Sequence, residues 1–107
     1  MEPRMPTHKT KAEVQTATAF NALAHARRVR IFLELHAQGT LCFEDISFKT
    51  KIPPTSLTHH LRVLKRAGFI KSKTRASYTD FYVDHSAFHL WFGAPEFLNK
   101  KIAAIAA

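Results

Sequence analysis

The fold is predicted chiefly from residues 54–83, PTSLTHHLRVLKRAGFIKSKTRASYTDFYV. The first half of this stretch carries leucines at the spacing of a helix with one buried face, namely Leu57, Leu61 and Leu64. Pro54 suits the first position of that helix, because the amide hydrogen that proline lacks has no helical partner there. Gly68 is typical of a residue that ends a helix. The sequence therefore predicts a helix from Pro54 to Ala67.

The second half of the stretch changes its period. Phe69, Ile70 and the segment from Tyr78 to Val83 are rich in aromatic and β-branched residues, which favour strands. The polar segment from Lys73 to Ser77 lies between them. Two such runs joined by a short polar segment predict a β-hairpin.

A second short helix is expected just before this stretch, from Cys42 to Thr50. Phe43 and Ile46, and with them Phe48, are candidates for its inward face. A turn over residues 51–53 joins it to the following helix. Two short helices separated by a tight turn indicate a helix-turn-helix motif. In that motif the second helix enters the major groove of DNA.

The remaining elements are also helices. Periodicity predicts them over residues 11–22, over 28–38 with Gly39 at its end, and from Asp84 through Phe92, with a further segment at 96–105. Residues 1–10 are polar and contain two prolines, so they are expected to form a flexible arm. The predicted organisation is an arm at 1–10 and one domain at 11–107. That domain is mostly α-helical with a β-hairpin wing.

The composition indicates an assembly larger than one chain. The chain has 107 residues, of which 46% are hydrophobic and nine are phenylalanine. A small single domain buries little surface, so a homodimer formed by the first and last helices is one way to cover the excess. The residues expected in that interface are Val14, Phe20, Phe88, Trp91, Phe92, Leu98 and Ile102.

The net charge of +8 favours an anionic partner. The segment 46–79 contains no Asp or Glu, and its basic residues are Lys49, Lys51, Arg62, Lys65, Arg66, Lys71, Lys73 and Arg75. These residues fall on a turn, a helix and a hairpin rather than opposite one apolar stripe, which argues against membrane binding. No apolar run is long enough to span a membrane and no signal peptide precedes the first helix, so a cytoplasmic protein is expected.

The polar face of the predicted helix at 54–67 supplies candidate contacts to double-stranded DNA. Hydroxyl, imidazole and guanidinium groups suit base edges and phosphates, and the candidates there are Thr55, Ser56, Thr58, His59 and Arg62. Lys73 and Arg75 at the hairpin tip would add backbone contacts. The plain alternative is a solvated polar face, and an interaction module for a protein or RNA is the second functional reading. No nucleophile–base constellation, phosphate loop or paired carboxylate indicates an enzyme, and no cofactor is expected.

Two segments resemble the arsenic-repressor (ArsR) family of transcription regulators. They are FNALAHARRVRI at 20–31 and SLTHHLRVLKRAGFI at 56–70, and the likeness extends over about residues 20–83. The resemblance implies a dimeric winged helix-turn-helix repressor of a pseudo-palindromic operator. It also implies release from that operator by a metal or another signal.

The chain departs from the family at both of the family's metal sites. The Cys-x-Cys site corresponds to Cys42-Phe43-Glu44, so the second thiolate is absent. The site on the last helix corresponds to Asp84, Ser86, Phe97 and Lys100, where only the aspartate is retained. Neither site can be carried over.

Other residues are candidates for sensing a signal. They are the single thiol of Cys42 for a redox role, and Asp84, His85 and His89 for a metal ion. Free cysteines are usually inert, and histidine pairs are common in a chain with seven. The positions of Arg27, Arg28 and Arg30 leave their role open.

Overall fold

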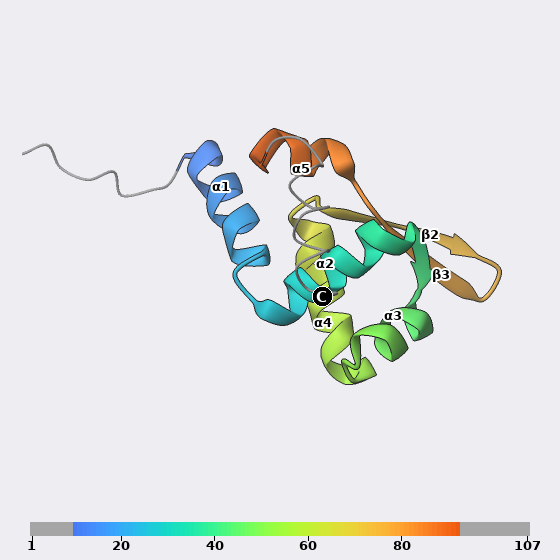
Figure 1. The fold of residues 1–107 in the computed structure, drawn as a ribbon. Helices are drawn as coiled ribbons and strands as arrows, with labels where there is room; N and C mark the ends of the chain where they lie inside the picture. Colours follow the sequence, from blue (N-terminus) through green and yellow to red (C-terminus); the bar gives the residue numbers. More distant parts are fainter. Residues whose placement is uncertain (1–9, 93–107) are drawn as a thin grey trace, which may run out of the picture.

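The computed structural model describes residues 10–92 of the chain, with the side chains of Trp91 and Phe92 left out. It contains five helices and a small antiparallel sheet, shown in Figure 1. In chain order these are α1 (Lys11–Ala22), α2 (Ala26–Gln38), β1 (Thr40–Cys42), α3 (Phe43–Thr50), α4 (Pro54–Arg66), β2 (Ile70–Arg75), β3 (Tyr78–Val83) and α5 (His85–Phe92). The predicted winged helix-turn-helix is therefore confirmed: α3 and α4 form the helix-turn-helix, and β2 and β3 form the wing.

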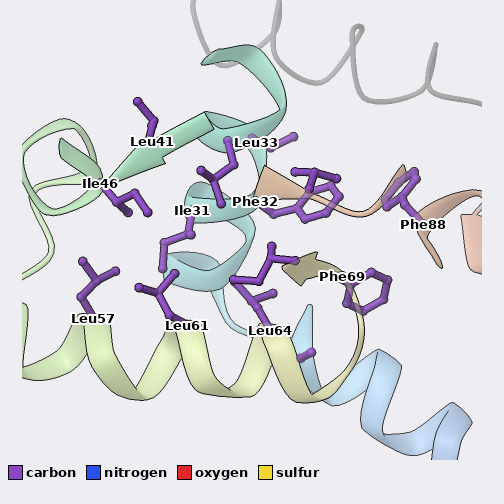
Figure 2. Close-up of a cluster of buried hydrophobic side chains, with 14 of the residues drawn as sticks. Ile31, Phe32, Leu33, Leu41, Ile46, Leu57, Leu61, Leu64, Phe69 and Phe88 are labelled. Atoms are coloured by element: carbon purple, nitrogen blue, oxygen red, sulfur yellow. The ribbon is translucent and has the colours of Figure 1, made fainter. Parts of the chain in front are cut away.

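The core lies between α2 and α4. In Figure 2 the three leucines of α4 point toward α2, while Phe69 and Phe88 lie at one end beside Phe32. Phe32 stacks on Phe88 with ring centroids 5.2 Å apart, and it meets Phe69 edge-on at 6.0 Å. This aromatic cluster joins the base of the wing and the start of α5 to the central helix.

Local signals set the ends of α4 as predicted. Pro54 occupies the first helical position, and the helix ends at Arg66 with Ala67 as its cap. Gly68 then takes a φ of 89°, a left-handed conformation that side chains disfavour. The amide of Phe69 donates to the carbonyl of Leu64. The chain therefore leaves the helix in a fixed direction toward β2.

The helix α2 begins earlier than predicted. The expected start was Arg28, but the helix begins at Ala26 because His25 caps it: the Nδ1 atom of His25 accepts a hydrogen bond of 3.2 Å from the amide of Arg27. Histidine is not among the usual capping residues, so the sequence pattern missed it. The first helix begins with a capping box. The side chain of Thr10 accepts a hydrogen bond from the amide of Glu13, and the side chain of Glu13 accepts one from the amide of Thr10. Thr10, assigned to the arm by sequence, is thus the cap of α1, and the rest of the predicted arm lies outside the described residues.

The sheet differs from the prediction in two ways. Its strand order is β1-β3-β2, so a third strand, part of which was expected to be helical, pairs with the hairpin. The hairpin strands also run further than expected. Arg75 pairs with Tyr78, which leaves only Ala76 and Ser77 in the turn and places Lys73 within β2.

Phe48 does not face inward, contrary to the prediction. Its side chain is 83% exposed, whereas Ile46 is fully buried. Residues two apart on an α-helix are about 200° apart around its axis, so a helix that buries one of them exposes the other. Phe43, which shares the face of Ile46, packs against the core as predicted.

Candidate nucleic-acid interface

The outward face of α4 carries the sequence-predicted contact residues. Thr55, Thr58, His59 and Arg62 are exposed, and Ser56 is half-buried. The first four occupy positions i, i+3, i+4 and i+7, which lie along one side of a helix. The opposite side is anchored in the core by leucines that are at most 4% exposed. The fold thus presents a polar stripe on a rigid helix.

The hydroxyl of Thr58 has a defined hydrogen-bonding role. It donates to the carbonyl of Pro54 one turn earlier, at 3.1 Å. A hydroxyl has one hydrogen to donate and two lone pairs to accept. While the bond to Pro54 is kept, Thr58 offers a ligand an acceptor only. In the major groove the matching donors are the amino groups of adenine and cytosine.

The wing brings an acidic residue to the predicted basic tip. The guanidinium Nε of Arg75 lies 2.9 Å from Oδ2 of Asp80, across the hairpin. This hydrogen bond and the charge of Asp80 raise the pKa of Arg75. The acid-free segment ends at residue 79, so this partner lay just beyond the stretch on which the prediction was based. Arg75 is partly neutralised, while Lys73 is exposed and belongs to no ion pair within the described part of the chain.

A side-chain bond connects the helix to the wing. The Nζ atom of Lys65 on α4 donates to the hydroxyl of Ser72 on β2 at 2.7 Å. The sequence identifies Lys65 only as one of the basic residues of segment 46–79. No local pattern predicts a hydrogen bond between two side chains that are seven residues apart. This exposed bond links α4 to the base of the wing.

The three arginines at the start of α2 have different surroundings. Arg30 lies 4.0 Å from Glu34 on the same helix and Arg27 is exposed. Arg28 is only 9% exposed, and its Nε and Nη1 atoms have no hydrogen-bond partner. Arg28 is near His60, a buried histidine of α4. The ring centroid of His60 lies 4.7 Å from the ring centroid of His25.

The pKa of His60 is lowered by this environment. Burial is the main cause, and the positive charges of His25, Arg28, His59 and Arg27 add to it. The folded protein therefore holds this imidazole neutral at a pH where the unfolded chain, with a histidine pKa near 6.5, binds a proton. Protons thus favour unfolding, and stability falls as the pH drops below that value.

We expect the free energy of unfolding to decrease between pH 7 and pH 5, with a slope of up to about 1.4 kcal/mol per pH unit from this one group. Urea denaturation at a series of pH values measures the slope. The variant His60→Gln should have a smaller slope than the wild type, since the other histidines titrate in both proteins. Equal slopes would show that His60 does not cause the acid sensitivity.

Cys42 lies at the junction of β1 and α3, as the residue that precedes the helix. The amide of Asp45 lowers the pKa of its thiol, but burial and the carboxylates of Asp45 and Glu44 outweigh that effect. The net result is a raised pKa. Because the thiolate is the reactive form, this environment disfavours redox chemistry at Cys42.

Two of the three candidate metal ligands, Asp84 and His85, are used in other contacts, and the third, His89, is exposed. Oδ1 of Asp84 accepts the amides of Ser86 and Ala87 at the start of α5, and Oδ2 pairs with Lys71 at 3.4 Å. Nε2 of His85 lies 3.0 Å from Nδ1 of His36 on α2. Within residues 10–92, no three histidine, cysteine or acidic side chains are grouped so that they could hold a metal ion. Phe97 and Lys100 lie outside that range.

The residues expected in a dimer interface fall into three groups. Val14 and Phe20 on α1 are 46% and 55% exposed. Phe88 is 4% exposed and stacks on Phe32, so it belongs to the core of its own chain. Trp91 and Phe92 lie in the last turn of α5, and Leu98 and Ile102 are outside the described residues.

An open hollow of about 420 Å³ lies between α1, the end of α4 and α5, and its lining includes Val14 and Leu90. Both α1 and α5 lie away from the tip of the wing (Figure 1).

Known proteins of one kind resemble this chain. The model of the arsR family of bacterial regulatory proteins matches residues 25–72, which span α2 through the start of β2. An uncharacterised HTH-type transcriptional regulator of Methanocaldococcus jannaschii is 29% identical over 69 residues, 64% of this chain and 78% of that protein. An arsenical resistance operon repressor of Bacillus subtilis is 29% identical over 73 residues, 66% of this chain and 70% of the repressor.

Solved structures have the same fold. The homodimeric winged helix-turn-helix DNA-binding domain of a Mycobacterium bovis protein superimposes with a TM-score of 0.61 at 24% identity. The match covers 96% of this chain and 87% of that domain. Within residues 10–92, no helix is long and apolar enough to cross a membrane.

Proposed function

The chain belongs to the arsR family of bacterial regulatory proteins, and on that premise we propose that it represses transcription as a homodimer on a pseudo-palindromic DNA site. The observation that carries the proposal is the exposed polar stripe of α4, which is linked to the wing by the bond from Lys65 to Ser72. In a helix-turn-helix protein this helix reads base edges in the major groove. Binding of chromosomal DNA would place the protein in the cytoplasm.

Two residues of the stripe are proposed to read bases, and the flanking cations to bind phosphates. Thr58 and His59 are exposed and lie at the middle of the stripe. Arg62, one turn further on, is exposed and has no ion-pair partner in the described part of the chain. Lys73 on the wing is also exposed and has no ion-pair partner among the described residues. Arg75 contributes less, because Asp80 occupies its Nε.

The homodimer is proposed to use α1 and α5. The exposed apolar side chains of Val14 and Leu90, which line one hollow, support it, and Phe20 adds a further exposed ring on α1. In this arrangement two α4 helices reach half-sites about one or two helical turns apart. Signals through the family's usual metal sites are not part of the proposal, because Glu44 stands where the second thiolate would be needed and Ser86 where a histidine would be needed.

The experiment that tests this function is DNA binding by the purified protein. Duplexes selected from a random pool by the wild type should share one pseudo-palindromic site. The variant His59→Ala should bind this site less tightly by about 1–3 kcal/mol and lose the preference at one base pair in each half-site. The affinity for random DNA should be unchanged. Fluorescence anisotropy on matched and mismatched duplexes gives both values.

The wing supplies the matched control for that experiment. Lys73→Ala should weaken binding to all sequences alike and reduce the salt dependence by about one unit for each phosphate that is no longer neutralised. If no duplex is preferred over random DNA, the repressor function is wrong. Binding to a protein or RNA in its place would support the alternative of an interaction module.

A further inference from the structure

Among residues 10–90, whose side chains the structure describes, Phe48 has the most exposed of the large hydrophobic side chains, at 83%. It lies in the last turn of α3 and takes no part in the core or in the surface of α1 and α5. Exposed apolar surface costs free energy in water, at about 25 cal/mol per Å². An aromatic ring that is held out from the fold therefore suggests a binding role.

The surroundings of Phe48 form a defined surface. An open hollow of about 570 Å³ is lined by Ser47, Phe48, Lys49, Lys51, Ile52 and Pro53. The hydroxyl of Ser47 donates to the carbonyl of Ile52 at 2.7 Å, and Ile52 is 3% exposed. The turn between the two helices is thus pinned to the core. The hollow is a fixed feature beside the ring.

The charge at this surface selects the kind of partner. Lys49 and Lys51 line the hollow, and neither forms an ion pair within the described residues. No acidic side chain is among the residues that line it. The carboxylates of α3, Glu44 and Asp45, lie in its first turn and do not line the hollow. An exposed apolar ring on a surface that carries two cations fits a polyanion that also carries apolar groups. DNA is such a molecule, because thymine exposes a methyl group in the major groove and phosphates flank it.

The position of the surface agrees with DNA. Pro53 lines the hollow and is also the residue before α4. The N-terminal end of a recognition helix is the part that contacts bases. The hollow is therefore continuous with the polar stripe that starts at Thr55. We propose that Phe48 contacts a thymine methyl group at the edge of each half-site while Lys49 and Lys51 hold the neighbouring phosphates.

This inference rests on the proposed function and is tested on the duplex that the wild type selects. Each thymine of that duplex is replaced in turn by deoxyuridine, which lacks only the methyl group. Each half-site should contain one thymine at which a single replacement weakens wild-type binding about fourfold. That ratio corresponds to about 0.8 kcal/mol for one buried carbon group. Phe48→Ala should bind the unmodified duplex at least fourfold more weakly and be insensitive to the same replacement.

Lys49→Ala is the matched control. It should weaken binding on every duplex and flatten the salt dependence, yet retain the fourfold effect of deoxyuridine. Thermal unfolding should be nearly unchanged in both variants, since both side chains are exposed. The inference is overturned if no thymine distinguishes wild type from Phe48→Ala while sequence-specific binding persists. A change of oligomeric state in Phe48→Ala would assign the ring to a second copy instead. Absence of any DNA preference would overturn the inference and the proposed function together.

Discussion

Phe32→Ala should destabilise the folded protein by about 3–5 kcal/mol, the loss expected when a fully buried phenylalanine is truncated. The ring is 2% exposed and touches two others, at 5.2 Å and 6.0 Å. Its removal leaves a cavity between the central helix, the base of the wing and the start of α5. Small domains have only about 5–15 kcal/mol of stability, so much of it would be lost.

The measurement is urea denaturation followed by circular dichroism at one fixed protein concentration, because dimerisation would also contribute to stability. Phe48→Ala is the matched control: the same atoms are deleted from an exposed site, and a change within about 0.5 kcal/mol is expected. Comparable losses in the two variants would show that Phe32 is not a central core residue.

A double substitution on α1, Val14→Asp with Phe20→Asp, should convert the proposed dimer to a folded monomer. Both side chains are about half exposed in the single chain, so the fold itself should tolerate carboxylates there. In an interface the same carboxylates would be buried without partners, which is unfavourable. A monomer reads one half-site, so affinity for the full site should fall at least about 100-fold through the loss of bivalent binding.

Sedimentation measures the assembly, and anisotropy on full-site and half-site duplexes measures the binding. Binding to a single half-site should be unchanged, which separates loss of the dimer from loss of the DNA surface. Phe48→Asp, with an added charge at an exposed ring of the other end of the domain, should remain dimeric. A double variant that sediments as the wild type does would contradict the proposed role of α1.

The candidate DNA residues of α4 could be proposed from sequence because they lie on one helix. A period of 3.6 residues separates the buried leucines of α4 from its polar stripe, so burial and exposure follow from spacing alone. What spacing could not provide was the partner of each side chain. Asp80 opposes Arg75 and Ser72 holds Lys65, and both contacts depend on how the hairpin folds back.

The errors have the same origin. Phe48 was expected inside on the basis of its hydrophobicity, although the position of Ile46 on the same helix turns it outward. Phe88 was expected in the dimer interface, whereas the fold uses it against Phe32. Composition indicates that a large side chain needs cover, but it does not indicate which surface supplies the cover.

By itself, the sequence determined the elements whose signals are local. Pro54, Gly68 and Asp84 mark helix ends through backbone geometry and capping, and these depend only on the adjacent residues. The tertiary structure alone decided the contacts between distant segments. The strand β1 forms only because β3 is placed beside it, with Leu41 opposite Phe81. His36 meets His85 for the same reason. Such contacts require the closure of long loops, and the packing of the whole core stabilises them rather than any local preference of the chain.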